Sequence, residues 1–476
     1  MKVKIKRALA AAVASVMLFA TACSEGAGGE NTEARTTNAD HEGLIAEVSR
    51  LVGHEALPDV QVEKKLKWLS WWEIDETQAA AELFRQKYGV PDKKDADDKS
   101  IIEHWNVSYA ARYEELGKRI SSGDSPDIFQ FEVENYPYSV YVNLFQSIDG
   151  VIDLSAPEWS DSLEAIEKFK WGGNNYCAIT ELVPSYFLWY RKSIIEESGL
   201  EDPYTLYKAG LWDWDKFLEI CASFTDPVNG KYAVSGWNPD NSLICTTGTG
   251  LITLENGELV NNMYDARVER AMDLISILCQ REYRYPHHIL NDWSMNYSEW
   301  RSGNILLWDN GQWFYSETLY KMRDKDNWAD DEIQLVPYPR DPYSDKYYQK
   351  MKQDSYMLCA GSKNIDGYKA WIQCNILTVK EPEVVQQARD KRTVDYGWTD
   401  AQLDVLEETV RDLVPVFDFK NGIGEDVGGT QAYELPVEMV TKYVYIHGEK
   451  TFTQLRAEVE GVINQRIKEL NASVNQ

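Results

Sequence analysis

The distribution of apolar and polar residues predicts strands that alternate with helices in the first part of the folded chain. Apolar residues dominate 65–72, and further apolar residues then recur at helical spacing until Gly89. A second strand-like run at 101–107 precedes a helical pattern that ends at Gly123, and 126–131 form a third strand-like run. This βαβαβ order is typical of a parallel sheet with helical crossovers. The sequence therefore predicts an α/β fold.

Aromatic and acidic residues follow the first and third predicted strands. Ligands of parallel α/β sheets lie beyond the carboxyl ends of the strands, so we expect a ligand at these loops. Flat rings suit the apolar faces of pyranose sugars, while carboxylate and amide groups bond to sugar hydroxyls. The chain has 17 Trp. Aromatic residues usually lie in the core of a protein, so we expect most of these rings to be buried and only a few to contact a ligand. The predicted ligand-binding residues of the two loops are Trp71, Trp72, Glu73, Glu132, Glu134 and Asn135.

Local signals predict further helices and a hairpin. Asp75 and Asp213 are expected to cap the helices that follow them. The pair Asn256-Gly257 predicts a tight hairpin turn, and a helix is expected over 266–279. The chain beyond residue 382 is predicted to be mostly helical.

The first 22 residues have the pattern of an export signal. A positively charged start precedes an apolar stretch, residues 8–20, that is too short to span a bilayer as a helix. The segment ends in Ala20-Thr21-Ala22-Cys23, which resembles the lipobox of bacterial lipoproteins although Ala20 replaces the usual Leu. The resemblance implies cleavage before Cys23 and a lipid on that cysteine. Residues 23–60 are then expected to be a lipid-anchored tether, and the protein to lie on the outer face of the bacterial cytoplasmic membrane.

Composition narrows the possible partners. The chain has 476 residues, which suggests two domains, and a formal net charge of -28. Such acidity argues against nucleic acid and anionic lipid surfaces, so we expect contact with the membrane through the lipid anchor alone. The cysteines other than Cys23 form no CxxC pair, and we predict neither a metal nor another cofactor. Whether these six cysteines form disulfides or stay thiols is left open by the sequence.

The order of several segments resembles extracellular solute-binding proteins of sugar-type ABC importers, the class that includes maltose-binding protein. None of the segments is specific alone, but they follow one another in the family's order between residues 64 and 380. Arg191 stands where the family usually has Asn, and Ile305-Leu306 replace Ala-Met. The segments are Gly123-Asp124-Ser125-Pro126-Asp127-Ile128, Leu188-Trp189-Tyr190-Arg191-Lys192, Ser198-Gly199-Leu200, Trp214-Asp215-Lys216-Phe217, 303–313, Val336-Pro337-Tyr338-Pro339 and Ser362-Lys363-Asn364.

This resemblance implies a two-lobed, type II periplasmic-binding-protein-like fold, each lobe a mostly parallel sheet flanked by helices, with the ligand cleft between the lobes. One lobe would combine 61–182 with 338–380, and the other 183–337 with 381–476. It also implies an oligosaccharide ligand, ABC transporter permease subunits as partners and a monomeric protein. The family's Gly-x-Trp segment places Trp313 against the ligand. Further candidate ligand contacts are Glu181, Trp237, Asn238 and Asp309.

Enzyme functions find little support in the motifs. The chain has no Gly-x-Ser-x-Gly, no phosphate-binding Gly-rich loop ending in Gly-Lys-Ser/Thr and no His-Glu-x-x-His. We therefore expect no enzymatic activity. A cell-surface glycosidase with two carboxylates stays open as an alternative, because any of the 77 acids could serve. A scavenging or adhesion lipoprotein is a second alternative, and a peptide or other polar solute is the alternative ligand.

Overall fold

The computed structural model describes residues 45, 48–236, 239–286, 297–424, 426–427 and 435–474. The signal segment 1–22, Cys23 and the beginning of the tether lie outside the described residues. Val48, Leu51 and Leu57 are buried, and the Tyr88 hydroxyl donates to the carbonyl of Pro58. Packing therefore begins by Val48, ahead of the expected boundary at residue 61.

The described chain forms two compact units. The first comprises the described residues up to Phe129 together with Leu358–Glu383, and the second comprises Gln130–Met357 and Val384–Gln476. Residues 130–182, expected in the first lobe, group here with the second unit. Their packing explains this, because the ring of Phe169 meets that of Phe417 at 4.7 Å.

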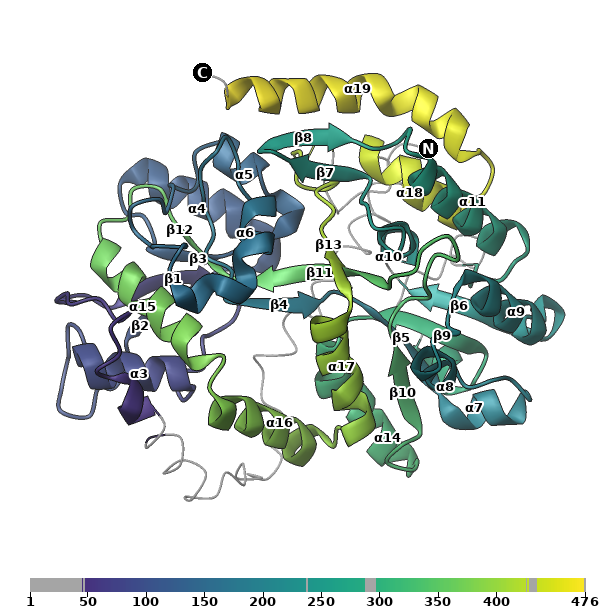
Figure 1. The fold of residues 1–476 in the computed structure, drawn as a ribbon, viewed down its shortest axis with the longest axis horizontal. Coiled ribbons are helices and arrows are strands. Elements are labelled where there is room, and N and C mark those ends of the chain that lie inside the picture. Colours follow the sequence, from purple (N-terminus) through teal and green to yellow (C-terminus); the bar gives the residue numbers. More distant parts are fainter. Residues whose placement is uncertain are drawn as a thin grey trace, which may run out of the picture. The chain divides into compact units, whose positions relative to one another are not determined.

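The first unit is built on the predicted parallel sheet. The strand order is β12-β3-β1-β2, and β1 pairs in parallel with both β2 and β3. Helix α3 packs against α15, and α4 contacts β1 (Figure 1). The elements are β1 (Leu66–Ser70), α3 (Ala79–Tyr88), β2 (Ile102–Asn106), the 3-10 turn Tyr109–Ala111, α4 (Arg112–Ser122), β3 (Ile128–Gln130), β12 (Tyr356–Leu358) and α15 (Ile365–Thr378). The alternation predicted for residues 65–131 is thus confirmed.

Only one of the two expected helix caps forms. Asp213 accepts a hydrogen bond from the backbone N–H of Lys216 at 3.0 Å and caps the helix that begins at Trp214. Asp75 does not cap the first helix. Its carboxylate instead accepts from the backbone N–H and the hydroxyl of Thr77, and Gln78 occupies the N-cap position. The helix begins later than expected because Asp75 closes its own local turn.

The second unit contains three sheets. The largest has the order β10-β5-β9-β6, a smaller one has the order β13-β11-β4, and β7 and β8 form a two-stranded hairpin. The turn residues Asn256 and Gly257 both have positive φ, as the hairpin prediction required. The strands are β4 (Glu181–Pro184), β5 (Phe187–Arg191), β6 (Tyr232–Gly236), β7 (Ile252–Glu255), β8 (Glu258–Asn261), β9 (Ile305–Asn310), β10 (Ile333–Val336), β11 (Tyr348–Asp354) and β13 (Val414–Val416).

The direction of the strands in the second unit differs from the expected mostly parallel arrangement. Strand β9 is parallel to β6, but β5 is antiparallel to both β9 and β10. Helical crossovers lie between β6 and β9, which makes that pair parallel. The apolar pattern of a strand carries no information about its direction, so the antiparallel pairs were not predictable from it.

Helices cover these sheets and form the C-terminal part, as predicted. Helix α9 packs on β6, α8 and α17 pack on β10, and α19 runs along the β7–β8 hairpin (Figure 1). The helices are α5 (Tyr138–Tyr141), α6 (Leu163–Lys168), α7 (Lys192–Glu197), α8 (Pro203–Lys208), α9 (Trp214–Phe224), α10 (Pro239–Cys245), α11 (Ala266–Gln280), α13 (Tyr297–Arg301), α14 (Tyr320–Asp326), α16 (Pro382–Tyr396), α17 (Asp400–Asp412), α18 (Pro436–Ile446) and α19 (Phe452–Ser473).

Aromatic side chains dominate the main core of the second unit. Trp189 on β5 stacks on Tyr315 at 5.6 Å and meets Trp398 edge-on at 5.9 Å. Its indole N–H donates to the carbonyl of Asn310 at 3.0 Å. The cluster consists of Phe187, Trp189, Tyr285, Trp300, Ile305, Trp308, Phe314, Tyr315, Leu319, Ile333, Leu335, Trp398, Leu403, Val405 and Leu406. Of the 15 tryptophans that the structure describes, 10 are buried, in line with the expectation that most of these rings lie in the core.

The six cysteines beyond Cys23 are all free thiols, and only Cys279 is not fully buried. The choice left open by the sequence is therefore resolved in favour of thiols. Among the described residues, no helix is long and apolar enough to cross a membrane.

Candidate binding sites at the strand ends

The loop after β1 places two tryptophan rings at the carboxyl end of the parallel sheet. Both Trp71 and Trp72 are half-buried. The Trp72 carbonyl accepts a hydrogen bond from the indole of the buried Trp68 at 3.0 Å, and the two rings meet edge-on at 5.1 Å. The Trp71 ring meets Tyr109 edge-on at 4.9 Å. The loop therefore has the position that the strand pattern predicted for a ligand site.

The acid of this loop points to solvent. The side chain of Glu73 is 83% exposed, and its carboxylate lies 3.6 Å from Nδ1 of His104. The other ring nitrogen of His104 lies 3.0 Å from the carbonyl oxygen of Ser70, at the end of β1. Glu73 is thus accessible to a ligand hydroxyl next to the two rings.

Sequence reasoning missed an arginine at this place. Arg112, the first residue of α4, has its guanidinium 3.6 Å from the ring centre of Tyr109, 4.8 Å from that of Tyr113 and 5.6 Å from that of Trp71. Tyr109 and Tyr113 were interpreted only as part of the helical pattern that ends at Gly123, and Arg112 was not considered. The available signal was their position directly after the second strand, at the same end of the sheet as Trp71.

The residues predicted after β3 lie in the second unit and differ in exposure. A 3-10 turn, Val133–Asn135, follows the strand and closes with a hydrogen bond from the Asn135 N–H to the Glu132 carbonyl. Glu134 is exposed, Glu132 is half-buried and Asn135 is buried. Of the three, Glu134 is therefore the most accessible to a ligand.

Trp313 lies after β9 with its ring in solvent. It is 46% exposed, although the next two residues, Phe314 and Tyr315, are buried in the aromatic core. A π-helical turn, Tyr315–Leu319, follows directly, and such turns occur frequently at functional sites. The indole nitrogen lies 2.4 Å from where a Cβ would stand on Gly311, so only glycine allows this ring position.

Asp309 is an interior residue. It is fully buried, and its carboxylate accepts a hydrogen bond from the hydroxyl of Tyr338 at 2.5 Å. Burial, and then the nearby charge of Asp309, raise the pKa of Tyr338 well above its ordinary value. Gly236 packs directly on the Cβ of Asp309, and the side chain is not accessible in this structure. Two other predicted contacts, Trp237 and Asn238, lie outside the described residues.

Glu181 faces a second carboxylate. The antiparallel ladder of β4 and β11 pairs it directly with Asp354, and both side chains reach solvent. The pKa of Glu181 is raised to about 7, first because the surrounding chain desolvates the carboxylate although part of the side chain reaches solvent, and then by the charge of Asp354, while Arg392 opposes the rise. Burial also raises the pKa of Asp354. Two like charges placed directly opposite each other repel, and this repulsion raises the pKa of a carboxyl group, as burial does. Solvent screens part of the repulsion between Glu181 and Asp354. Sequence reasoning missed Asp354 because strand pairing between distant segments is not visible in the chain.

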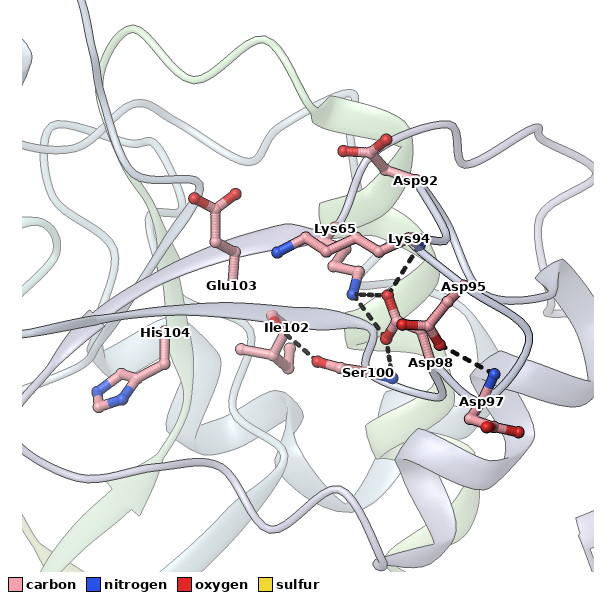
Figure 2. Close-up of a pocket in the computed structure, with 10 residues that line it drawn as sticks. All are labelled: Lys65, Asp92, Lys94, Asp95, Asp97, Asp98, Ser100, Ile102, Glu103 and His104. Atoms are coloured by element: carbon pink, nitrogen blue, oxygen red, sulfur yellow. Dashed lines mark hydrogen bonds and ion pairs between the residues drawn. The ribbon is translucent and has the colours of Figure 1, made fainter.

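A charged pocket of about 540 Å³ lies at the opposite end of the first sheet. Figure 2 shows its centre, where the carboxylate of Asp98 accepts hydrogen bonds from the ammonium of Lys65 and the backbone N–H of Lys94. These bonds, that of Lys65 first, lower the pKa of Asp98 to about 2. The pocket borders the amino ends of β1 and β2 and has no Phe, Tyr or Trp in its lining. Its central charges, those of Lys65 and Asp98, are already paired with each other within the protein.

Among the described residues there is no group of three or more His, Cys, Asp or Glu that could hold a metal ion.

The sequence profile of one protein family, described as bacterial extracellular solute-binding protein, matches residues 102–372. This match covers more than half of the chain.

The chain belongs to the bacterial extracellular solute-binding protein family.

Several solved structures are similar to this solute-binding protein at low sequence identity. Each match covers nearly the whole length of the other chain. The GacH receptor of Streptomyces glaucescens, solved unliganded and with acarbose, has a TM-score of 0.58 and 16% identity, covering 86% of this chain and 99% of its own. The galacto-N-biose/lacto-N-biose I-binding protein of the ABC transporter from Bifidobacterium longum was solved with lacto-N-biose. It has a TM-score of 0.60 and 12% identity, and the match covers 87% of this chain and 99% of the other.

A third similar structure is the ABC substrate-binding protein Lmo0181 from Listeria monocytogenes in complex with cycloalternan. Its TM-score is 0.55 at 12% identity, and the match covers 87% of this chain and 98% of the other. No curated protein sequence matches the chain. The predicted fold class, a periplasmic-binding-protein-like α/β fold, is confirmed by the family and by these structures.

The carboxylate pair of this solute-binding protein predicts a pH-dependent stability. Because the folded state raises the pKa of Glu181 from the usual 4.5 to about 7, folding favours its protonated form. That contribution is complete below pH 4.5 and is lost as the pH rises through 7. Glu181→Gln, which is always neutral, should therefore melt at a higher temperature than the unchanged protein at pH 8, and this difference should shrink at pH 5.

The control for this experiment is Glu114→Gln. Glu114 pairs with Lys118, and that hydrogen bond lowers its pKa, so it does not titrate in the same window. Melting curves at four pH values between 5 and 8 provide the measurement. A Glu181→Gln difference that does not change with pH would show that the pair is not coupled as described.

Proposed function

We propose that this protein captures an oligosaccharide outside the cell and delivers it to the permease subunits of an ABC importer. The observation that carries the proposal is Trp313, whose ring reaches solvent although its neighbours Phe314 and Tyr315 are buried. An exposed indole held by a rigid core is a suitable contact for the apolar face of a sugar ring. The similar structures solved with acarbose, lacto-N-biose and cycloalternan support the same ligand class.

The polar residues around the exposed rings suit a ligand with many hydroxyl groups. Glu73 is exposed beside Trp71 and Trp72, and Glu134 is exposed after β3. Carboxylates accept hydrogen bonds from sugar hydroxyls, which orients a ligand whose binding energy comes largely from ring contact. The proposal includes Trp71, Trp72, Glu73 and Trp313 as ligand contacts.

The carboxylate pair is the observation that favours a second function, glycoside hydrolysis. Glu181, with its raised pKa, resembles the general acid of a glycosidase, and the directly opposite Asp354 resembles its partner. Binding without turnover is the better supported function, since the family is one of binding proteins. The two functions differ in whether the sugar is recovered unchanged.

A panel of ligands tests both functions. We expect at least one of acarbose, lacto-N-biose, cycloalternan and maltotetraose to raise the melting temperature, whereas a tripeptide and spermidine do not. A ligand at 100 times its dissociation constant should add roughly 2.7 kcal/mol to the free energy of unfolding. Chromatography of the sugars after incubation should return them unchanged. Stabilisation by the tripeptide or spermidine alone would refute a sugar as the ligand. New products in the chromatogram would support glycoside hydrolysis as the function.

We also propose that the protein is a monomer held on the membrane by a lipid on Cys23. The lipobox-like sequence and the family's extracellular location support the lipid anchor. Cys23→Ser should move the protein from the membrane fraction to the soluble fraction and abolish incorporation of labelled palmitate. The matched control is Ser24→Ala, which keeps the cysteine. Membrane-bound, palmitate-labelled Cys23→Ser protein would contradict the anchor.

A further inference from the structure

Arg112 is a nearly buried cation surrounded by aromatic rings at the carboxyl end of the first sheet. Only 8% of it is exposed, and its Nη1 donates a hydrogen bond to the carbonyl of Tyr109 at 2.5 Å. The guanidinium lies over the face of Tyr109 and close to Trp71 and Tyr113. A guanidinium group stacks on rings more strongly when water is excluded.

This position is unfavourable for the helix itself. Arg112 is the first residue of α4, and a positive charge at the N-terminal turn of a helix opposes the helix dipole. Residues that break a local rule in this way are expected at functional sites. The compensating gain here is the order that Arg112 gives to the rings.

The rings that Arg112 orders are themselves accessible. Tyr109 is 40% exposed and meets Trp71 at an interplanar angle of 86°. Arg112 lies over one face of Tyr109, and its hydrogen bond fixes the backbone that carries this ring. The two rings thus form one surface whose shape depends on a single side chain behind it.

We propose that Arg112 is a positioning residue that holds Trp71 and Tyr109 as one rigid surface for a sugar ring. This rests on the proposed sugar-binding function and adds Tyr109 to the ligand contacts. A surface that is ordered before binding loses less side-chain freedom when the sugar arrives, so Arg112 raises affinity without touching the ligand. Lysine cannot replace it, because an ammonium group has no plane to stack on Tyr109.

The test compares two arginines of the same helix. Arg119 also lies over a ring, 4.6 Å from the centre of Trp105, and it pairs with Glu115. Both are changed to lysine, and binding of the four sugars of the panel is measured by calorimetry well below the melting temperature. Arg112→Lys should weaken binding roughly threefold to tenfold, in line with one lost cation–π contact. Arg119→Lys should bind as the unchanged protein does.

A second readout reports on the ring itself. In protein labelled with 5-fluorotryptophan, the ¹⁹F signal of Trp71 is assigned with Trp71→Phe. Without any sugar, Arg112→Lys should shift or broaden this signal, and Arg119→Lys should not. Tyr109→Leu, at an exposed position, should lose affinity as Arg112→Lys does and serves if that variant fails to fold.

The outcomes separate the two proposals. Unchanged affinity and an unchanged Trp71 signal in Arg112→Lys would overturn the positioning role. A Tyr109→Leu variant that binds sugar as the unchanged protein does would overturn the shared surface. If the unchanged protein binds none of the four sugars, the proposed function fails, while the ¹⁹F signal still decides whether Arg112 holds the Trp71 ring.

Discussion

The burial of Trp189 is the constraint on which the second unit most depends. This ring is fully enclosed, stacks on Tyr315 and needs an acceptor for its N–H, which the carbonyl of Asn310 supplies at the end of β9. This hydrogen bond ties the end of β9 to the middle of β5. Because Phe314 and Tyr315 turn inward to this core, Trp313 is left facing water. The exposed ring that we assign to ligand binding is thus a consequence of how its neighbours pack.

In both units, the exposed aromatic rings lie next to buried groups that restrict their movement. In the first unit the buried Trp68 donates to the carbonyl of Trp72, and Arg112 lies behind Trp71 and Tyr109. Each exposed ring is thus attached to a group that cannot move freely. Rigid aromatic surfaces bind with a small loss of conformational freedom, which suits a receptor that must capture a dilute solute.

Much of the fold was predictable because the spacing of apolar residues indicates each strand or helix, and the order of these elements along the chain indicates the fold class. The strands and helices between residues 65 and 131 appear where the alternation predicted them, with Gly89 and Gly123 at positive φ after their helices. Strand direction in the second unit was not predictable, because residues that pair are far apart in sequence. The same reason hid Asp354, which lies opposite Glu181. The burial of Asp309, a predicted ligand contact, was not foreseen for another reason. Asp309 belongs to a strand that is buried at all six positions, where a hydrogen bond from Tyr338 helps to offset the cost of burying a carboxylate.

Calorimetry on Trp313→Ala, with Trp189→Ala for comparison, shows whether the Trp313 ring binds sugar while the core ring of Trp189 supports the fold. Full burial of an apolar side chain is worth about 1.5–3 kcal/mol, so Trp313→Ala should weaken sugar binding roughly tenfold to a hundredfold and leave the free energy of unfolding within about 1 kcal/mol. Trp189→Ala should lose about 3–5 kcal/mol of stability, with the affinity of the folded protein little changed. A Trp313→Ala protein that is several kcal/mol less stable and binds sugar with unchanged affinity would contradict this account.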